Sequence, residues 1–412
     1  MIKEALFLFT EGYIRLMIRV LHIVTAFPRS DDEHSMTPWL VSLLKGLKER
    51  GVESTILAPS YKGLGDQVVQ GISVRRFRYF IKDWETLTHD EATPVKLSRK
   101  PWYITLVPFM LFFGIKKMKK LIKLERFDLV HVHWPIPMAI IALPAVGKIP
   151  IVMEFYGAEM ALVRRNILLK YFAKWIAKRG DYCIAISSYT ASLVRDITGI
   201  TPVVIPYACD FPTKVNKPVF PEKKSPKNLL FVGRLVERKG VEYLIRAIPY
   251  IRREIDVRLK IIGGGPLLNN LKELAKQLKV DDIVEFSGIV SNEEKDKAYR
   301  ECDLFILPAC FDKKGDTEGL GVVLLEALSY GKPVIASSVG GIVDIVKNGK
   351  TGILVKEKEP KEIARAVLKL LSDKNLYLKI AENGYNFVKE NFSIEKIAEQ
   401  TYETYKNLLD AI

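Results

Sequence analysis

Two glutamates stand eight positions apart in the stretch GDTEGLGVVLLEALSYGKP, residues 315–333. On one continuous helix, eight residues give a rotation of about 80° and a rise of about 12 Å, so Glu318 and Glu326 could not share a proton. If Glu318 lies in the loop before the helix, the next four residues present free backbone N–H groups at the positive end of the helix dipole. These four are Gly319, Leu320, Gly321 and Val322. The pattern predicts an anion site beside Glu318, with Glu326 placed farther on to bind paired ribose hydroxyls.

A predicted strand comes directly before this loop. The segment CDLFILP, residues 302–308, is a short apolar run bounded by polar residues, which is typical of a buried strand. Ligands of parallel α/β sheets bind at the carboxyl ends of the strands. The order of strand, loop and helix therefore predicts that the anion is a phosphate group.

Strand-like runs alternate with helical patterns along the chain, in two series. The first series lies at residues 19–24, 54–59, 127–133, 150–155, 182–187 and 202–207, and the second at 228–235, 258–265, 283–289, 302–308, 333–338 and 352–355. Alternation of this kind predicts parallel sheets covered by helices on both faces. The predicted fold class is α/β, with two doubly wound Rossmann-like domains.

The length also favours two domains, because 412 residues exceed one ordinary core. Residues 209–227 are rich in proline and charge, which predicts a linker between an N-terminal domain, 1–208, and a C-terminal domain, 228–390. Residues 1–16 precede the first predicted strand and are interpreted as an extension or an overlong start. The last segment, 391–412, is predicted to be a helix that packs on the N-terminal domain.

The composition favours a globular protein with anionic partners. The chain is 48% hydrophobic and its formal net charge is +15, which favours phosphorylated ligands, acidic lipid surfaces or nucleic acid. Nucleic acid is disfavoured, because the basic residues are not interleaved with aromatic side chains that could stack on bases. The four cysteines form no C-x-x-C pair, which predicts neither a disulfide framework nor a zinc ribbon. With no secretion signal recognised at the start, we expect a cytoplasmic protein.

Residues 100–126 combine an apolar run with a basic end. The apolar part, residues 102–115, is about 14 residues long, shorter than the roughly 20 that span a bilayer. Five lysines follow it: Lys116, Lys117, Lys119, Lys120 and Lys123. The pattern suits a helix lying in an anionic membrane interface, and equally a helix that packs on the sheet with a solvated lysine end. The first interpretation predicts a peripheral contact with the cytoplasmic face of the membrane; both stay open.

Four motifs in order carry a resemblance to a known family. The segments FVGRLVERKG, IIGGGPL, FSGIV and EGLGVVLLEALSYGKPVIASSVGGIVDIVKNGKTGILV lie between residues 231 and 355. Their order and spacing resemble the C-terminal domain of the retaining GT-B glycosyltransferases of family 4. The resemblance implies a nucleoside-diphosphate sugar donor of UDP or GDP type and retention at the anomeric carbon. It further implies no essential metal, no other cofactor, and an active site in the cleft between the two domains.

The resemblance assigns roles to the matched residues of the C-terminal half. It implies that Arg234 and Lys239 contact the donor diphosphate, that Glu318 contacts sugar hydroxyls, and that Glu326 contacts the ribose. The N–H groups of residues 319–322 would contact the phosphates. Two cations just after a strand end, facing a helix N-terminus, would also neutralise a leaving diphosphate.

Two further segments are expected to border the nucleotide. By resemblance, Val290 lies where the family packs on the base and binds it through the main chain. The run of glycines at 263–265, which contains Gly264 and Gly265, would let the backbone approach the nucleotide closely.

The N-terminal half matches the family at DLVHVHWPIPMAI, residues 128–140. By resemblance, His133 lines the cleft near the reacting sugar, where an imidazole can donate to a hydroxyl or a phosphate oxygen. His131 and His133 share one strand face, but no third residue has a spacing suited to a metal site, so no metal is expected. A second histidine of the family pattern is replaced by Tyr156, which can still form hydrogen bonds.

These features predict a hexosyltransferase-type glycosyltransferase that acts on an acceptor hydroxyl in glycan, polysaccharide or glycolipid biosynthesis. The expected acceptor is a glycan or a lipid-linked molecule, and a small soluble sugar or sugar phosphate is the alternative. A sugar-nucleotide epimerase of the same architecture is a second alternative, because it would use the same phosphate site. An epimerase would alter the donor without any acceptor.

Overall fold

The structure is a computed structural model that describes residues 17–33, 36–90, 93–212, 218–221 and 226–412. The expected extension at 1–16 and two parts of the expected linker, 213–217 and 222–225, lie outside the described residues. Contacts divide the chain into two compact units. Unit 1 holds the described residues up to Ala185, residues 191–205 and Ile397–Ile412, and unit 2 holds Ile186–Thr190 and the described residues of Pro206–Lys396.

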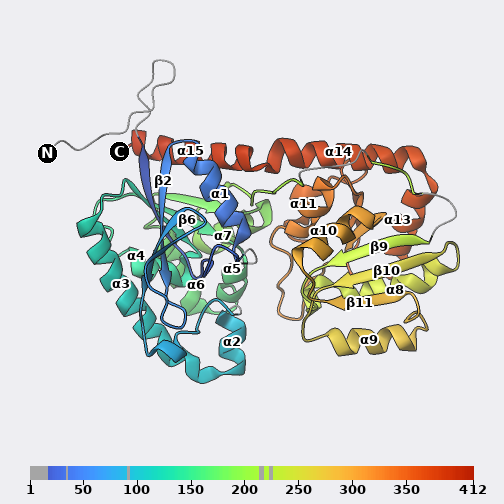
Figure 1. Ribbon diagram of the computed structural model, residues 1–412, viewed down its shortest axis with the longest axis horizontal. Coiled ribbons are helices and arrows are strands. Elements are labelled where there is room, and N and C mark those ends of the chain that lie inside the picture. The colour runs from blue at the N-terminus through green and yellow to red at the C-terminus, as the bar shows by residue number, and fades with distance from the viewer. Residues whose placement is uncertain (1–16, 34–35, 91–92, 213–217, 222–225) are drawn as a thin grey trace, which may run out of the picture. The chain divides into compact units, whose positions relative to one another are not determined.

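Unit 1 contains a sheet of eight strands in the order β3-β4-β2-β1-β5-β6-β7-β8. Figure 1 labels β2 and β6 of this sheet and the helices packed around it. All neighbouring strands in the described sheet are parallel except the β3–β4 pair. The strands are β1 (Ile18–Ile23), β2 (Val52–Pro59), β3 (Gln67–Val69), β4 (Ile72–Phe77), β5 (Leu129–His133), β6 (Ile151–Phe155), β7 (Tyr182–Ala185) and β8 (Val203–Val204). The central strands read as near-continuous apolar runs because helices cover both faces of the sheet.

The strand order determines on which face of the sheet the helices of this part of the chain lie. They are α1 (Pro38–Lys48), η1 (Lys82–Trp84), α2 (Thr93–Arg99), η2 (Pro101–Thr105), α3 (Leu106–Leu124), α4 (Pro135–Ala142), α5 (Ala158–Val163), α6 (Ile167–Ala177) and α7 (Ser188–Thr198). The connection through α1 runs from β1 toward β2, whereas those through α3, α4 and α6 run toward β5, β6 and β7. Since such crossovers are right-handed, α3, α4 and α6 cover the face of the sheet opposite to α1.

The segment at 100–126 forms a short 3₁₀ turn, η2, followed by α3. Pro108 lies in the first turn of α3, where a missing N–H costs no internal hydrogen bond. Gly114 packs against α4, because a Cβ there would lie 2.7 Å from Ile141 Cδ1. Among the described helices, none is both long enough and apolar enough to cross a membrane.

Unit 2 contains a sheet of six strands, all parallel, in the order β11-β10-β9-β12-β13-β14. The strands are β9 (Lys227–Val232), β10 (Val257–Ile262), β11 (Val284–Gly288), β12 (Leu304–Leu307), β13 (Val334–Ser337) and β14 (Ile353–Val355). The helices are η3 (Glu237–Lys239), α8 (Val241–Arg252), α9 (Leu268–Gln277), α10 (Asn292–Glu301), α11 (Val322–Ser329), α12 (Ile342–Ile345), α13 (Pro360–Ser372) and α14 (Lys374–Phe392). The two doubly wound α/β domains predicted from the sequence are therefore confirmed.

The last helix, α15 (Ile394–Asp410), follows α14 after Ser393 and belongs to unit 1 from Ile397 onward. Its Tyr405 is fully buried in that unit, and the Tyr405 hydroxyl lies 2.6 Å from His131 Nδ1 on β5. The C-terminal segment of the chain thus contributes a side chain to the core beside β5.

Candidate functional site

Unit 2 has its topological switch point between β9 and β12. After β9 the chain continues to β10 on one side of the sheet, and after β12 it continues to β13 on the other side. The connections therefore leave these two neighbouring strands in opposite directions. Ligands of parallel α/β sheets bind at the carboxyl ends of such a strand pair. The loops after β9 and β12 carry the predicted cations and the first predicted glutamate.

Lys239 and Glu318 meet across this switch point. The Lys239 Nζ donates to Glu318 Oε2, and Arg238 Nη1 lies 3.4 Å from the same oxygen. Lys239 and Glu318 are both buried. Burial alone would raise the pKa of Glu318, but the charges of Lys239 and Arg238 outweigh it and hold the pKa below its usual value. The carboxylate is therefore ionised at neutral pH.

The loop that carries Glu318 is fixed by close backbone contacts. Thr317 Oγ1 donates to the Cys310 carbonyl, and the Gly341 N–H donates to the Glu318 carbonyl, both at 3.0 Å. Gly340 has a φ of 55°, and a Cβ there would lie 2.1 Å from the Glu318 carbonyl oxygen. Only glycine fits at that position, so the segment after β13 holds Glu318 in place.

The helix α11 starts directly after this loop, with Gly321 as its N-cap residue. The N–H groups of residues 319–322 make no hydrogen bond within the part of the chain that the structure describes. Free N–H groups at a helix start, where the helix dipole is positive, can bind an anion. The structure thus has the loop and helix that the sequence predicted for Gly319, Leu320, Gly321 and Val322.

The two arginines after β9 differ in their surroundings. Arg234 follows the strand end at Val232 and is exposed, and its guanidinium makes no ion pair or hydrogen bond with any described residue. Arg238, which the sequence analysis did not single out, donates to the Thr317 carbonyl at 3.4 Å and lies 3.7 Å from Asp316 Oδ2. Arg238 therefore already serves as a counter-ion within the protein, whereas Arg234 is available for a ligand.

The glycine run after β10 packs on protein backbone. A Cβ on Gly265 would lie 2.5 Å from the Leu235 carbonyl oxygen, so the missing side chain lets the loops after β9 and β10 approach each other. Gly264 instead faces Ile289, whose Cγ1 would lie 3.4 Å from a Cβ at that glycine. Ile289 is 88% exposed, and the neighbouring Val290 is partly buried. The exposed apolar side chain at this edge is therefore one residue before the predicted Val290.

Glu326 lies on α11 and bonds to side chains of α10. Its Oε1 accepts from Lys295 Nζ at 3.2 Å, and its Oε2 accepts from Tyr299 Oη at 2.7 Å. Burial raises the pKa of Tyr299 far above its usual value, so the hydroxyl keeps its proton and donates. Glu318 and Glu326 thus have separate partners, as their spacing predicted.

Unit 1 has a second cluster at the switch point of its own sheet, between β1 and β5. His22 on β1 lies opposite His131 on β5, and His133 on β5 lies opposite Glu154 on β6. Alternate residues of a strand face the same side of a sheet, so these four side chains gather on one face. All four are buried.

Glu154 is the central acceptor of this cluster. Its Oε2 lies 2.9 Å from His133 Nδ1 and 3.3 Å from His131 Nε2, and Tyr156 Oη donates to it at 2.7 Å. Burial alone would raise the pKa of Glu154, but the close contacts with His131 and His133 hold it far below its usual value. The predicted residues His133 and Tyr156 are also brought together, with Nδ1 and Oη 2.6 Å apart.

Two further contacts complete the cluster. His22 Nδ1 lies 3.0 Å from His133 Nε2, and Tyr405 Oη lies 2.6 Å from His131 Nδ1. Burial lowers the pKa of His131 to about 4 and that of His22 well below its usual value, so both imidazoles are neutral at pH 7. His22, Glu154 and Tyr405 are not predictable from the residue pattern, because only the strand order and the path of α15 bring them together.

The cluster overturns one step of the sequence argument. No third residue was found with a spacing suited to a metal site, yet His22 supplies one, since ligand atoms of His22, His131 and His133 lie within 4.8 Å of one another. A zinc ion needs ring nitrogens whose lone pairs converge on it at about 2.0–2.1 Å. His22 Nδ1 and His133 Nε2 instead form a hydrogen bond with each other. The residues therefore fit a hydrogen-bond network better than a metal site. The absence of a metal stays a prediction.

Comparisons with known proteins identify the family. The protein-family model described as Glycosyltransferase Family 4 matches residues 38–211, and the family model described as Glycosyl transferases group 1 matches residues 213–387. The two matches follow one another along the chain; the first covers β2 to β8 of the sheet in unit 1, and the second covers all six strands of the sheet in unit 2. The chain therefore belongs to the glycosyltransferases of group 1 and family 4, and it is an enzyme of the hexosyltransferase class.

Individual relatives agree with this assignment. An uncharacterized glycosyltransferase of Methanocaldococcus jannaschii is 28% identical over 85% of this chain and 94% of its own. A GDP-mannose-dependent alpha-(1-6)-phosphatidylinositol monomannoside mannosyltransferase of Mycobacterium tuberculosis is 38% identical over 40% of this chain and 44% of its own. The solved structure of sucrose-phosphate synthase from Thermosynechococcus elongatus has a TM-score of 0.75 and 19% identity, and the match covers 96% of this chain and 100% of that one. That likeness confirms the predicted GT-B fold.

Proposed function

We propose that this glycosyltransferase moves a sugar from a nucleoside-diphosphate sugar to an acceptor hydroxyl, with retention of the anomeric configuration. The observation that carries the proposal is the buried Lys239–Glu318 pair at the switch point of unit 2, next to the free N–H groups that start α11. A lysine ammonium has three donors, so Lys239 can keep its bond to Glu318 and still donate to a phosphate oxygen.

The donor fits this edge of unit 2 in a definite order. Arg234, Lys239 and the N–H groups of residues 319–322 bind the diphosphate, whose negative charge they match. Glu318 accepts from hydroxyls of the sugar, and Glu326 accepts from the ribose. The base lies against Ile289 and Val290, because the 88% exposed Ile289 side chain offers an apolar surface to a flat ring.

The reaction exchanges one bond at the anomeric carbon for another. The bond from C1 to the diphosphate oxygen breaks, its electron pair stays on that oxygen, and C1 develops oxocarbenium character. The acceptor oxygen bonds to C1 from the same face, and its proton passes to the departing phosphate oxygen. Arg234, Lys239 and the start of α11 stabilise the charge on the diphosphate, and this fixed electrostatic environment is the main catalytic effect.

The cluster in unit 1 supplies the other polar groups of the proposal. Glu154 accepts from His133 Nδ1 and from Tyr156, which fixes the orientation of the His133 ring. We assign His133 and Tyr156 to hydrogen bonding with the reacting sugar or phosphate, for which His133 Nε2 must exchange its hydrogen bond with His22 Nδ1 for one to the ligand. The mechanism needs no metal ion, because cationic side chains neutralise the leaving group.

The acceptor is assigned to a membrane-borne lipid or lipid-linked glycan, and the protein to the cytoplasmic side of a membrane. The lysine-rich α3 and the net charge of +15 support this assignment, and one relative is named for a phosphatidylinositol-based acceptor. A small soluble sugar or sugar phosphate is the alternative acceptor.

A thermal-shift panel tests the donor site. The unliganded protein is compared with samples containing UDP, GDP, ADP and their sugars; a ligand at 100 times its dissociation constant should add about 2.7 kcal/mol of stability. The stabilising sugar is then incubated with lipid extracts and with soluble sugars, and products are separated. No stabilisation by any nucleoside diphosphate would contradict the donor site, and conversion of the donor without an acceptor would indicate an epimerase.

A further inference from the structure

Unit 1 exposes an aromatic surface that none of the described residues covers. It is formed by η1, η2 and the first half of α3, and we call it the aromatic platform. Its members are Ile81, Trp84, Trp102, Ile104, Phe109, Phe112 and Phe113, all exposed. Trp84 and Trp102 contact each other with ring centroids 5.0 Å apart, and Phe80 joins Trp84 to Phe109. Contiguous exposed apolar surface of this kind marks an interaction site.

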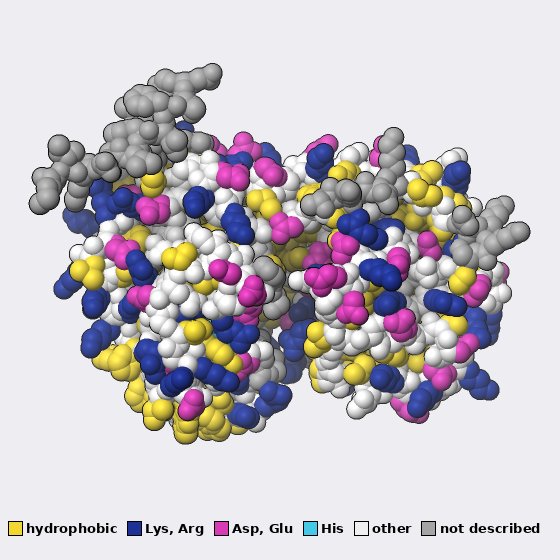
Figure 2. Space-filling view, viewed as in Figure 1, with side chains coloured by type: hydrophobic (Ala, Val, Ile, Leu, Met, Phe, Trp, Pro, Cys, Tyr) yellow, Lys and Arg dark blue, Asp and Glu magenta, His cyan; other side chains and the backbone are white. Residues whose placement is uncertain are grey.

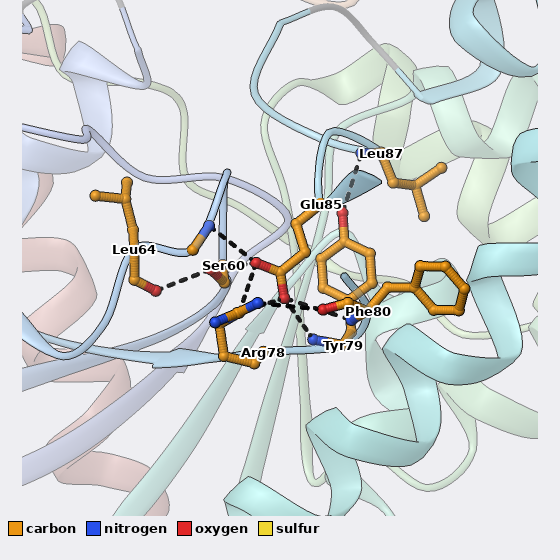
Figure 3. Close-up of polar contacts among 8 residues, drawn as sticks. Ser60, Leu64, Arg78, Tyr79, Phe80, Glu85 and Leu87 are labelled. Atoms are coloured by element: carbon orange, nitrogen blue, oxygen red, sulfur yellow. Dashed lines mark hydrogen bonds and ion pairs between the residues drawn. The ribbon is translucent and has the colours of Figure 1, made fainter. Parts of the chain in front are cut away.

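A buried carboxylate anchors the η1 part of the aromatic platform (Figure 3). Glu85 follows η1 directly, is fully buried, and accepts from Arg78 Nε at 2.7 Å and from the Tyr79 N–H at 2.9 Å. It also accepts from Ser60 Oγ at 2.9 Å and from the Gly63 N–H at 3.0 Å. These bonds tie the turn that carries Trp84 to the ends of β2 and β4, so the Trp84 ring projects from an anchored turn.

The exposed stripe of α3 changes from aromatic to basic along its length. Phe109, Phe112, Lys116, Lys120 and Lys123 recur at intervals of three or four residues and are all exposed, which places them on one helix face. The stripe covers fourteen steps, or about 21 Å. A helix with this pattern can place its aromatic half in the acyl region of a bilayer while its lysines reach the headgroups.

The helix α6 repeats the pattern, although the sequence analysis assigned it no role. Leu168, Tyr171 and Trp175 form an exposed stripe at intervals of three and four, with Leu168 74% and Tyr171 68% exposed. The Arg179 guanidinium lies 4.0 Å from the centroid of the Trp175 ring. Residues 161–180 contain six Lys and Arg and no Asp or Glu: Arg164, Arg165, Lys170, Lys174, Lys178 and Arg179. Cations around exposed aromatic side chains favour an anionic apolar partner over a neutral one.

The two stripes belong to one face of the unit. The helices α3, α4 and α6 cover the same side of the sheet, and α4 contacts both α3 and α6. Figure 2 shows yellow side chains gathered at the lower end of unit 1, with dark blue ones beside them. A flat partner can therefore meet both helices together.

We propose that this face, formed by the aromatic platform, the α3 stripe and the α6 stripe, docks on an anionic lipid bilayer. A bilayer is favoured over a protein partner because aromatic side chains and a surplus of cations occur together on two separate helices, which matches an interface of acyl chains and acidic headgroups. The inference rests on the proposed function, because docking on a bilayer would bring the enzyme to a lipid-borne acceptor. It identifies α6 as a second membrane-contacting helix.

Vesicle co-sedimentation of the full chain tests the docking face. The protein is mixed with vesicles of phosphatidylcholine alone, or of phosphatidylcholine with phosphatidylglycerol, at low and high salt. We expect binding to the anionic vesicles only, and weaker binding at high salt. The double variant Leu168→Ser with Tyr171→Ser should reduce the partition coefficient between anionic vesicles and solution about tenfold or more. The double variant Lys174→Gln with Lys178→Gln should reduce it about fivefold for each charge removed.

Matched controls separate the docking face from general surface effects. Val219→Ser removes another exposed apolar side chain, and Lys48→Gln removes an exposed cation of α1, on the opposite face of the sheet; both should bind vesicles like the unmodified protein. The inference is overturned if the α6 variants bind as well as these controls. It is also overturned if light scattering shows a dimer that Leu168→Ser with Tyr171→Ser converts to a monomer. Donor-induced thermal shifts, measured on the same variants, report separately on the proposed function.

Discussion

Lys239 and Glu318 come from loops after two different strands of unit 2 and form a buried ion pair. The pair fixes the Lys239 ammonium beside the N–H groups that start α11. A group that is already desolvated and oriented loses little on meeting a phosphate, and this is the property that electrostatic catalysis requires.

Removing the lysine should affect turnover and stability separately. Lys239→Ala should lower turnover about 100- to 1,000-fold and, because Glu318 is left buried without that cation, destabilise the fold by about 3–5 kcal/mol. Lys239→Met with Glu318→Gln should recover much of the stability and none of the turnover. Steady-state kinetics and urea unfolding measure the two effects.

Two companion variants control this comparison. Lys272→Ala, at an exposed position of α9, should leave both measurements unchanged. Arg234→Ala should lower turnover to the same degree as Lys239→Ala without the loss of stability, because Arg234 is exposed. Turnover reduced less than about fivefold in both Arg234→Ala and Lys239→Ala would contradict the diphosphate assignment.

Gly340 tests whether the backbone around Glu318 matters. Gly340→Ala should destabilise the protein and lower turnover at least about tenfold, because its Cβ would displace the Glu318 carbonyl, 2.1 Å away. Gly147→Ala is the matched control, since Gly147 has a similar φ of 63° but no atom near its Cβ position. The Gly147→Ala variant should lose about 1–2 kcal/mol of unfolding free energy, the cost of placing alanine in a left-handed conformation, and should keep full activity. Equal turnover of the two variants would show that the Glu318 loop tolerates displacement.

The sequence predicted most strands of both sheets because buried parallel strands read as apolar runs. It missed the three-residue β3, and it missed β4, where Arg75 and Arg76 interrupt the apolar run. Arg76 is nevertheless buried: its Nη2 donates to the Phe27 carbonyl at 3.2 Å and to the Pro28 carbonyl at 2.7 Å. A charged residue can stay in a core when backbone acceptors satisfy it, and the residue pattern alone does not show such acceptors.

The candidate site was predictable where it follows one loop and not where it depends on strand order. Residues 318–322 lie on one continuous segment, so their spacing predicted the helix start. Three consecutive charged residues, Glu237, Arg238 and Lys239, gave no sign of which side chains turn toward Glu318; the η3 turn brings in both Arg238 and Lys239. Glu154 became a neighbour of His133 only because β6 pairs with β5.

The histidine cluster gives a prediction about metal ions. His22 Nδ1 and His133 Nε2 form a hydrogen bond with each other, so we expect no stoichiometric zinc in the purified protein. Turnover should be the same after chelation and after addition of Zn²⁺. Elemental analysis and activity assays check this. Stoichiometric zinc that disappears in His22→Ala would overturn the prediction and establish a metal site of His22, His131 and His133.

Glu159 gives a prediction about pH and stability. Its carboxyl accepts from the Tyr156 N–H, its Oε2 is buried without a hydrogen-bond partner among the described residues, and burial raises its pKa to about 7. The folded state thus favours the protonated form. Stability from this group is complete below pH 4.5, the usual value for a glutamate, and it is lost as the pH rises through about 7.

Glu159→Gln removes this dependence while keeping the shape of the side chain. Relative to the variant, the unmodified protein should lose up to about 3 kcal/mol between pH 5 and pH 8. The urea midpoints of the two proteins should therefore diverge at alkaline pH. Glu403→Gln, at an exposed glutamate of α15, should track the unmodified protein at both pH values. Parallel stability profiles for Glu159→Gln and the unmodified protein would mean that the Glu159 carboxyl is ionised and stabilised within the fold, contrary to its burial.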